Sequence, residues 1–233
     1  MTAPLTLGVL GGMGPAATLD FLQKLQAYTP AKADQDHLRV LVDINPRVPD
    51  RNAPGSLAGP VLAEMAGALR GAGAEVLAMP CNTAHAHASL IQRASGLPLV
   101  DLIEAGAGAA AGSGARRAGV LATKGALKLY REYLAAHAMG LVALSAEGQE
   151  RFMALLYRIK AGDLGPEVRQ GMAALAKSLI ADGAEAVIAG CTEAPLVLDQ
   201  ADLKVEFIDP ADQLARQCVA VCLGMQPVPA LPG

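Results

Sequence analysis

The chain has 233 residues, of which 52% are hydrophobic, and a formal net charge of −3 at pH 7. This length allows a sizeable core and is sufficient for two domains of about 100 residues each. The small charge, the lack of a basic run and an aromatic content of 3% argue against nucleic acid as a partner. No apolar stretch is long enough to cross a membrane, and the first residues do not follow the pattern of a secretory signal. We therefore expect a cytoplasmic protein.

The first half of the chain predicts strands that alternate with helices. An apolar run at Thr6–Leu10 leads into a glycine-rich loop, and an amphipathic pattern follows that loop. Residues 45–60 contain four prolines and are expected to form a functional loop. The other elements expected in this half are strands at residues 38–44, 76–79 and 99–100 and helices at 61–70 and about 82–94.

The second half repeats this order. Residues 119–123 match residues 8–12, residues 184–191 match residues 74–81, and residues 205–209 match residues 97–101 in position. The offsets between these landmarks, 108 to 111 residues, are nearly constant, which indicates an internal duplication. The helices expected here are at residues 127–137, 149–160, 167–181 and 210–223.

Strands that alternate with helices of this length predict an α/β fold with parallel sheets. We expect two similar, flavodoxin-like, three-layer domains, with an active-site cleft between them. The first domain would consist of residues 1–97 and 209–233 and the second of residues 98–208. Ligands of such sheets bind beyond the carboxyl ends of the strands, where both repeats place a cysteine.

These two cysteines are the first candidates for chemistry. Cys81 and Cys191 each follow a predicted strand, 110 residues apart, with a threonine close behind. A thiol at the start of a helix lies near backbone N–H groups and the positive end of the helix dipole, so we expect a lowered pKa. Burial as a small apolar side chain is the alternative. Cys218 and Cys222 have helical spacing among apolar residues and are assigned to the core, not to a metal site.

The glycine-rich loop allows two interpretations. Gly12–Ala17 fits the pattern G-x-G-x-x-A of dinucleotide-binding loops, which need an acidic residue about 20 positions later. Asp43, at the end of the second strand, is farther away. The other interpretation is a loop whose backbone N–H groups hold an anion such as a carboxylate.

Several polar side chains lie near the predicted strand ends. Short hydrogen-bonding groups there either bind a ligand or cap a helix, and these are Asn82, Thr83, Thr123 and Thr192. His85 and Glu193 lie near the two cysteines and are candidates for orienting them. By pattern alone, the isolated cations Arg51 and Lys160 are more typical of solvated surface charges.

Two acid–base groups of one kind, from two equivalent halves, suit a reaction that is nearly symmetric. In racemisation one group removes a proton from one face of a carbon, and the other group donates a proton to the opposite face. The negative charge that develops must be stabilised by hydrogen-bond donors. A single thiolate nucleophile is the competing interpretation, although it normally requires a histidine base.

A resemblance to a known family rests on motifs that extend over nearly the whole chain. In order, these motifs are Leu10-Gly11-Gly12-Met13-Gly14-Pro15-Ala16-Ala17-Thr18, Asn45-Pro46-Arg47-Val48-Pro49-Asp50-Arg51, Met79-Pro80-Cys81-Asn82-Thr83-Ala84-His85, Leu121-Ala122-Thr123, Lys160-Ala161-Gly162 and Gly190-Cys191-Thr192-Glu193. Together they resemble the aspartate racemases of the aspartate/glutamate racemase family. The resemblance implies two α/β domains with the site between them, a homodimer, and catalysis without pyridoxal phosphate, metal or any other cofactor.

The resemblance also implies a role for each site residue. Cys81 and Cys191 would be the acid–base pair, while Arg51 and Lys160 would hold the side-chain carboxylate of an aspartate substrate. The residues implied in other substrate contacts are Gly12, Met13, Asn82, Thr83, Thr123 and Thr192. The chain departs from the family pattern at Ala126, where a second threonine is common.

Three alternatives remain open. The first is a racemase of glutamate or another amino acid. The second is an isomerase that converts a dicarboxylate such as maleate between cis and trans forms, with one cysteine as the nucleophile; relatives of that type also carry two cysteines. The third is an amino-acid-binding protein without catalysis.

Overall fold

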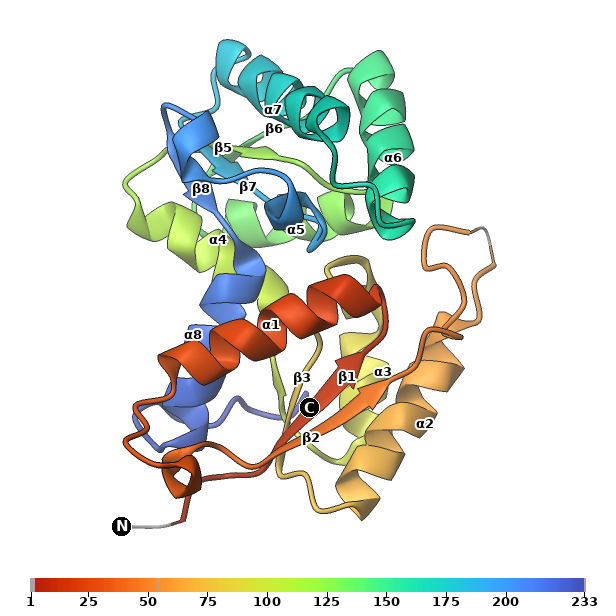
Figure 1. Cartoon of the computed structure of the whole chain (residues 1–233), viewed down its shortest axis with the longest axis vertical. Coiled ribbons are helices and arrows are strands. Elements are labelled where there is room, and N and C mark those ends of the chain that lie inside the picture. Colours follow the sequence, from red (N-terminus) through yellow and green to blue (C-terminus); the bar gives the residue numbers. More distant parts are fainter. Residues whose placement is uncertain (1–2, 54, 233) are drawn as a thin grey trace. The chain divides into compact units, whose positions relative to one another are not determined.

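The computed structural model describes residues 3–53 and 55–232 (Figure 1). The chain divides into two compact units. One unit contains the residues up to Leu102 and those from Ala211 onward, and the other contains Ile103–Pro210. Each unit contains a four-stranded parallel sheet.

The first unit has the strand order β2-β1-β3-β4. Helices α2 and α3 pack together on one side of this sheet, and their buried side chains form a cluster with Leu10 and Leu77. Helices α1 and α8 lie on the other side (Figure 1). The strands are β1 (Leu7–Gly11), β2 (Val40–Ile44), β3 (Val76–Ala78) and β4 (Leu99–Val100), and the helices are α1 (Pro15–Tyr28), α2 (Ala58–Gly71), α3 (Ala88–Ser95) and α8 (Pro210–Cys222).

The second unit repeats this topology with the strand order β6-β5-β7-β8. Helices α6 and α7 supply most of one buried cluster, which includes Phe152, Met172 and Leu179. The strands are β5 (Arg117–Val120), β6 (Gly140–Val142), β7 (Ala186–Ile188) and β8 (Glu206–Ile208), and the helices are α4 (Leu102–Gly112), α5 (Lys124–Ala136), α6 (Ala146–Lys160) and α7 (Pro166–Ala181). The predicted fold class, α/β with two similar parallel-sheet domains, is confirmed.

The duplication is visible in the packing of equivalent glycines on the two central strands. A Cβ atom added to Gly8 in β1 would lie 2.8 Å from Cβ of Ala74. A Cβ atom added to Gly119 in β5 would lie 2.9 Å from Cβ of Ala184 and 2.9 Å from Cβ of Leu179. Each central strand therefore packs closely against the turn that leads into the strand before the cysteine, β3 or β7.

Several local expectations are corrected by the structure. The loop expected at residues 45–60 is shorter, because α2 begins at Ala58. The helix expected from residue 82 begins as a 3₁₀ turn, Thr83–His87, and becomes α-helical at Ala88. Strand β6 and helix α4 were not predicted, since no recurring motif marks β6 and α4 consists mostly of alanine and glycine.

The last features of the fold are the two remaining cysteines and the lengths of the helices. Cys218 and Cys222 are buried in α8, as predicted, and none of the four cysteines forms a disulfide. Across residues 3–53 and 55–232, none of the helices combines the length and the apolar character needed to cross a bilayer.

Candidate active site

In the first unit, the loops that follow parallel strands meet at the carboxyl edge of the sheet. Strand β1 ends at Gly11 and β2 at Ile44, and the N–H of Asn45 donates to the carbonyl of Gly11 at 3.3 Å. Gly12 has a φ of 93°, and a Cβ atom there would lie 2.5 Å from the backbone of Asn45. Only glycine fits both the conformation and the close approach at this position.

Arg51 is bound to the glycine-rich loop rather than surrounded by solvent. Its Nη2 donates to the carbonyl of Met13 at 3.2 Å, and its Nη1 donates to the carbonyl of Pro49 at 3.3 Å. The Nε atom is buried and, within the described residues, has no hydrogen-bond partner. The prediction of a solvated cation, made from pattern alone, is therefore wrong for Arg51. Its charge lies beside the loop that was predicted to hold an anion.

Cys81 follows β3 at the same edge and is 5% exposed. The N–H of Cys81 donates to the carbonyl of Met79 at 2.7 Å, which closes a tight turn after the strand. Asn82, 2% exposed, precedes the 3₁₀ turn, and its side chain makes no capping hydrogen bond there. Helix capping, the alternative to ligand binding, is thus not the role of Asn82.

His85 contacts the main chain of Cys81 rather than its sulfur. The ring Nδ1 lies 2.9 Å from the carbonyl oxygen of Cys81, and Nε2 lies 3.1 Å from the backbone nitrogen of Leu102. Because the Leu102 N–H can only donate, Nε2 must accept and Nδ1 carries the hydrogen. Burial lowers the pKa of His85, so the imidazole is neutral. This histidine positions the backbone at Cys81.

In the second unit, Thr123 lies just beyond β5 and is 2% exposed. Its Oγ1 accepts a hydrogen bond from the N–H of Ala126 at 3.3 Å and so caps α5. The Nε2 of Gln149, from α6, donates to the carbonyl of Ala122 at 3.0 Å. Gln149 was not singled out in the sequence, because nothing in its local pattern indicates a contact with this strand end.

Cys191 lies beyond β7, the equivalent of β3, in a buried polar group. Cys191, Thr192 and Glu193 are 7%, 2% and 2% exposed. The thiol of Cys191 donates to Oε2 of Glu193 at 3.0 Å. The other oxygen of that carboxylate, Oε1, binds the ammonium of Lys160, the last residue of α6. Lys160 itself is exposed, as the pattern suggested, but its ammonium is held in an ion pair with a buried carboxylate.

The pKa of Cys191 corrects an expectation. A strand-end thiol was predicted to have a lowered pKa, but burial raises the pKa of Cys191 well above its usual value. The negative charge of Glu193 raises it further, and Lys160 opposes this rise. The element after Cys191 is only a three-residue 3₁₀ turn, Ala194–Leu196, so a strong helix dipole is lacking.

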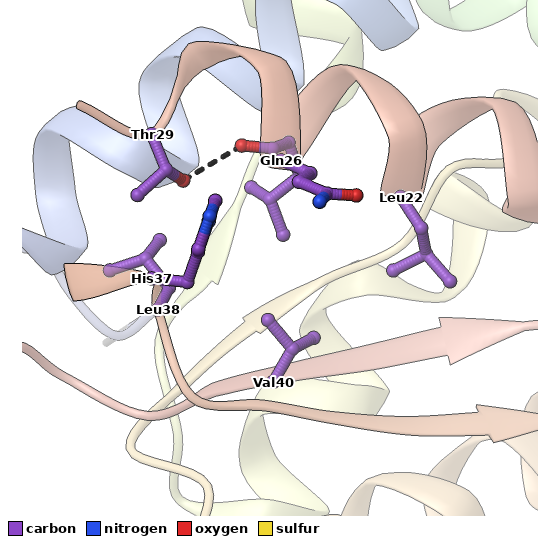
Figure 2. Close-up of a pocket in the computed structure, with 7 residues that line it drawn as sticks. Leu22, Gln26, Thr29, His37, Leu38 and Val40 are labelled. Carbon is purple, nitrogen blue, oxygen red and sulfur yellow. Dashed lines mark hydrogen bonds between the residues drawn. The ribbon is translucent and has the colours of Figure 1, made fainter. Parts of the chain in front are cut away.

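A pocket elsewhere in the first unit contains none of the predicted site residues. This pocket, of about 240 Å³, lies between α1 and the start of β2, away from the carboxyl ends of the strands (Figure 2). The hydroxyl of Thr29 in this pocket donates to the carbonyl of Leu25 at 2.8 Å. The lining is Leu22, Leu25, Gln26, Thr29, His37, Leu38 and Val40. Among the described residues, no three His, Cys, Asp or Glu side chains are grouped to hold a metal ion.

The structure thus defines a class of protein: two α/β units of one topology, each with a buried thiol beyond its third strand. Residues 10–218 match the family model of Asp/Glu/hydantoin racemases. The chain belongs to this family. It is an isomerase, an amino-acid racemase of the Asp/Glu type.

Individual relatives agree with this assignment. The chain is 26% identical over 231 residues to the broad specificity amino-acid racemase RacX of Bacillus subtilis, covering 94% of this chain and 99% of the relative. It is 32% identical over 194 residues to a glutamate racemase of Synechococcus, covering 80% of this chain and 71% of that enzyme. The crystal structure of an aspartate racemase homologue from Pyrococcus horikoshii is similar with a TM-score of 0.76 and 26% identity, covering 94% and 99% of the two chains.

Proposed function

We propose that this protein racemises aspartate and that Cys81 and Cys191 act on opposite faces of the α-carbon. The observation that carries the proposal is the pair of buried thiols beyond equivalent strands, Cys81 after β3 and Cys191 after β7. The mechanism requires both sulfur atoms to reach one α-carbon. It also requires one thiolate and one thiol before each turnover.

In the proposed mechanism the thiolate of one cysteine removes the α-proton, and the C–H electron pair stays on the substrate. The thiol of the other cysteine then donates its proton to the opposite face, so the product leaves with inverted configuration. The roles of the two cysteines exchange in the reverse direction. The chemistry consists of two proton transfers and needs no cofactor. Hydrogen-bond donors on the α-carboxylate stabilise the negative charge that develops between the two transfers.

Donors of the required kind lie near both thiols in the chain. We assign contacts with the α-carboxylate and the amino group to Asn82, Thr83, Thr123 and Thr192. Asn82, Thr123 and Thr192 are each 2% exposed, so their hydrogen bonds form with little competition from water. The backbone at Gly12 and Met13 contributes to the same contacts.

The preference for a dicarboxylic substrate rests on two cations. Arg51 is bound to carbonyl oxygens by Nη1 and Nη2 and, within the described residues, forms no ion pair. A substrate carboxylate would supply its charge partner. Lys160 is the second cation and lies near Cys191 through Glu193. Ala126, buried in place of the second threonine common in the family, removes one hydroxyl and leaves a smaller side chain.

Two further proposals concern the working form of the protein. We propose a homodimer, to be tested by light scattering of the purified chain. We also propose that it works in the cytoplasm, since the mechanism needs both thiols reduced and disulfides are rare in that compartment.

The first test follows the α-proton. L-Aspartate incubated with the reduced protein in D₂O, without added cofactor, should lose its α-proton signal in NMR spectra, and D-aspartate should appear. Cys81→Ser and Cys191→Ser should each lower the rate of racemisation by about 10²–10⁴-fold, because each face needs its own acid–base group. Cys222→Ala, which alters a thiol in α8, serves as the matched control and should retain turnover.

The same experiment can contradict the proposal in distinct ways. Near-normal racemisation by either serine variant would rule out the two-thiol mechanism. Faster turnover of glutamate or alanine than of aspartate would replace the proposed substrate. Conversion of maleate to fumarate without exchange of any α-proton would favour the dicarboxylate isomerase. Binding of aspartate in calorimetry without turnover would indicate a binding protein.

A further inference from the structure

Beyond β7, the buried carboxylate of Glu193 binds both a thiol and an ammonium group. Oε2 of Glu193 accepts a hydrogen bond from the Cys191 thiol at 3.0 Å, and Oε1 binds the Lys160 ammonium. The Glu193 side chain is 3% exposed and the Lys160 side chain 24%. All three residues belong to the second unit.

This arrangement favours one protonation state of the thiol. A carboxylate can only accept hydrogen bonds, so the sulfur must carry the hydrogen that they share. Ionisation of Cys191 would place a second negative charge 3.0 Å from the Glu193 carboxylate, in a site with little water to screen the repulsion. Glu193 and Lys160 are the charged groups that act on the Cys191 thiol among the described residues, and Lys160 offsets this repulsion only in part.

We infer that Glu193 is a positioning residue that holds Cys191 as the proton donor in the substrate-free protein. The catalytic meaning of this inference rests on the proposed function. With Cys191 as the donor, Cys81 is the cysteine that removes the α-proton in the first turnover. The resting protein is then asymmetric and accepts first the enantiomer whose α-proton faces Cys81.

The ion pair between Glu193 and Lys160 also influences Cys191 when a substrate is bound. A substrate carboxylate that binds Lys160 must share the ammonium with Glu193, which already occupies it. The incoming carboxylate adds negative charge near Cys191 and further disfavours its thiolate. Binding of a dicarboxylic substrate therefore strengthens the donor role of Cys191 instead of reversing it.

The test measures the ionisation of Cys191 without turnover. The purified full-length protein is alkylated with iodoacetamide across a pH series, and the peptide that contains Cys191 is quantified by mass spectrometry. Glu193→Gln keeps the shape of the side chain but removes its charge, so the midpoint of the Cys191 profile should fall by one pH unit or more. A shift of one unit corresponds to a ~10-fold larger thiolate fraction at neutral pH.

Two other variants separate this effect from a general loosening of the site. Lys160→Met removes the opposing positive charge and should raise the midpoint, whereas exposure to water would lower it in both variants. Glu185→Gln removes a glutamate of the same unit that pairs with Arg116 at the surface, and it should leave the midpoint unchanged. Circular dichroism checks that each variant is folded.

The outcomes distinguish this inference from the proposed function. A midpoint that stays constant or rises in Glu193→Gln overturns the inference, and so does a fall in Lys160→Met. If the midpoints move as expected but no amino acid exchanges its α-proton, the proposed function is wrong and the protonation state of Cys191 stands. If racemisation occurs while the midpoints fail to move, only the role of Glu193 is wrong.

Discussion

His85 shows how burial decides the state of a single side chain. Both ring nitrogens are hydrogen-bonded to the main chain, one to the carbonyl of Cys81 and one to the N–H of Leu102. A protonated ring would lose the second of these bonds, because both nitrogens of an imidazolium are donors. Burial and the Leu102 hydrogen bond thus oppose protonation and outweigh the Asp101 charge and the Cys81 carbonyl, which favour it.

This state predicts a pH dependence of stability. The pKa of His85 in the folded protein is lowered from 6.5, so the unfolded chain binds a proton first as pH falls. The stability that neutral His85 contributes is complete above the unfolded pKa and is lost as pH falls toward the folded pKa. The free energy of unfolding should therefore decrease from about pH 7 to pH 5, with a limiting slope of about 1.4 kcal/mol per pH unit for one proton.

Urea unfolding of His85→Gln measures this contribution. The glutamine amide can donate to Cys81 and accept from Leu102 without titrating, so the slope should become smaller. Some slope should persist, since burial also lowers the pKa of His87. His37→Gln changes an exposed side chain of the same unit and serves as the control. An unchanged slope in His85→Gln would show that His85 does not set this pH dependence.

Arg51 and Lys160 show the limit of local pattern. Each is an isolated cation in its stretch of sequence, yet each binds partners beyond it: Arg51 the carbonyl of Met13 and Lys160 the carboxylate of Glu193. The family resemblance placed both at the substrate, and that assignment remains a proposal. Arg51 is partly buried, whereas Lys160 is exposed and differs from an ordinary surface cation in its ion pair with a buried carboxylate.

The two central strands depend on glycine for the same reason. In β1 and β5, the residue that faces the turn before β3 or β7 has no side chain, and the turn fills that space with Ala74 or Ala184. The duplication therefore preserves a packing contact as well as a motif. In both units the strand before the cysteine, β3 or β7, pairs directly with this central strand.

Alanine substitution tests this contact in both repeats. Gly8→Ala and Gly119→Ala should each lower the free energy of unfolding of their own unit by about 1–3 kcal/mol, because an added methyl group overpacks the interior. Gly67→Ala is the matched control: Gly67 lies within α2, has no atom within 4 Å of an added Cβ, and should gain about 0.5–1 kcal/mol. Hydrogen exchange read peptide by peptide assigns each change to its unit. A loss at Gly67 as large as at Gly8 would contradict this explanation.

The two units differ in how the chain forms them. The first unit is built from both ends of the sequence, and α8 returns to it after the second unit is complete. Helix α8 buries Leu214, Ala215 and Cys218 completely. The hydroxyl of Tyr28 in α1 binds Asp212, and Arg216 donates to the same hydroxyl at 2.8 Å. The first unit is therefore incomplete without the last helix, whereas the second is continuous in sequence.

Truncation should reveal this inequality. A chain that ends at Pro210 lacks the apolar face of α8, so limited proteolysis should digest peptides of the first unit rapidly while peptides of residues 103–210 stay protected. A chain that ends at Gln226 removes only the proline-rich tail, in which Val228 and Leu231 are exposed, and should resist digestion in both units. Equal protection of the first unit in both truncated chains would show that α8 is dispensable for its fold.

Contiguous patterns in the sequence were sufficient for the fold class and the family. Apolar runs that end in glycine, proline or cysteine indicate strands and turns locally, and their recurrence after about 110 residues indicates duplication. Strand β6 was not found in this way, because no glycine, proline or cysteine closely follows Gly140–Val142 and none of the recurring motifs includes it. Its place is set by pairing with β5.

The chemistry of the candidate site depended instead on contacts between residues distant in sequence. Glu193 and Lys160 are 33 positions apart, and His85 reaches Leu102 across 17. The protonation of Cys191 follows from burial, and burial is a property of everything packed around a group. A motif can specify that a thiol follows a strand, but the free energy of ionising that thiol is set by the folded surroundings.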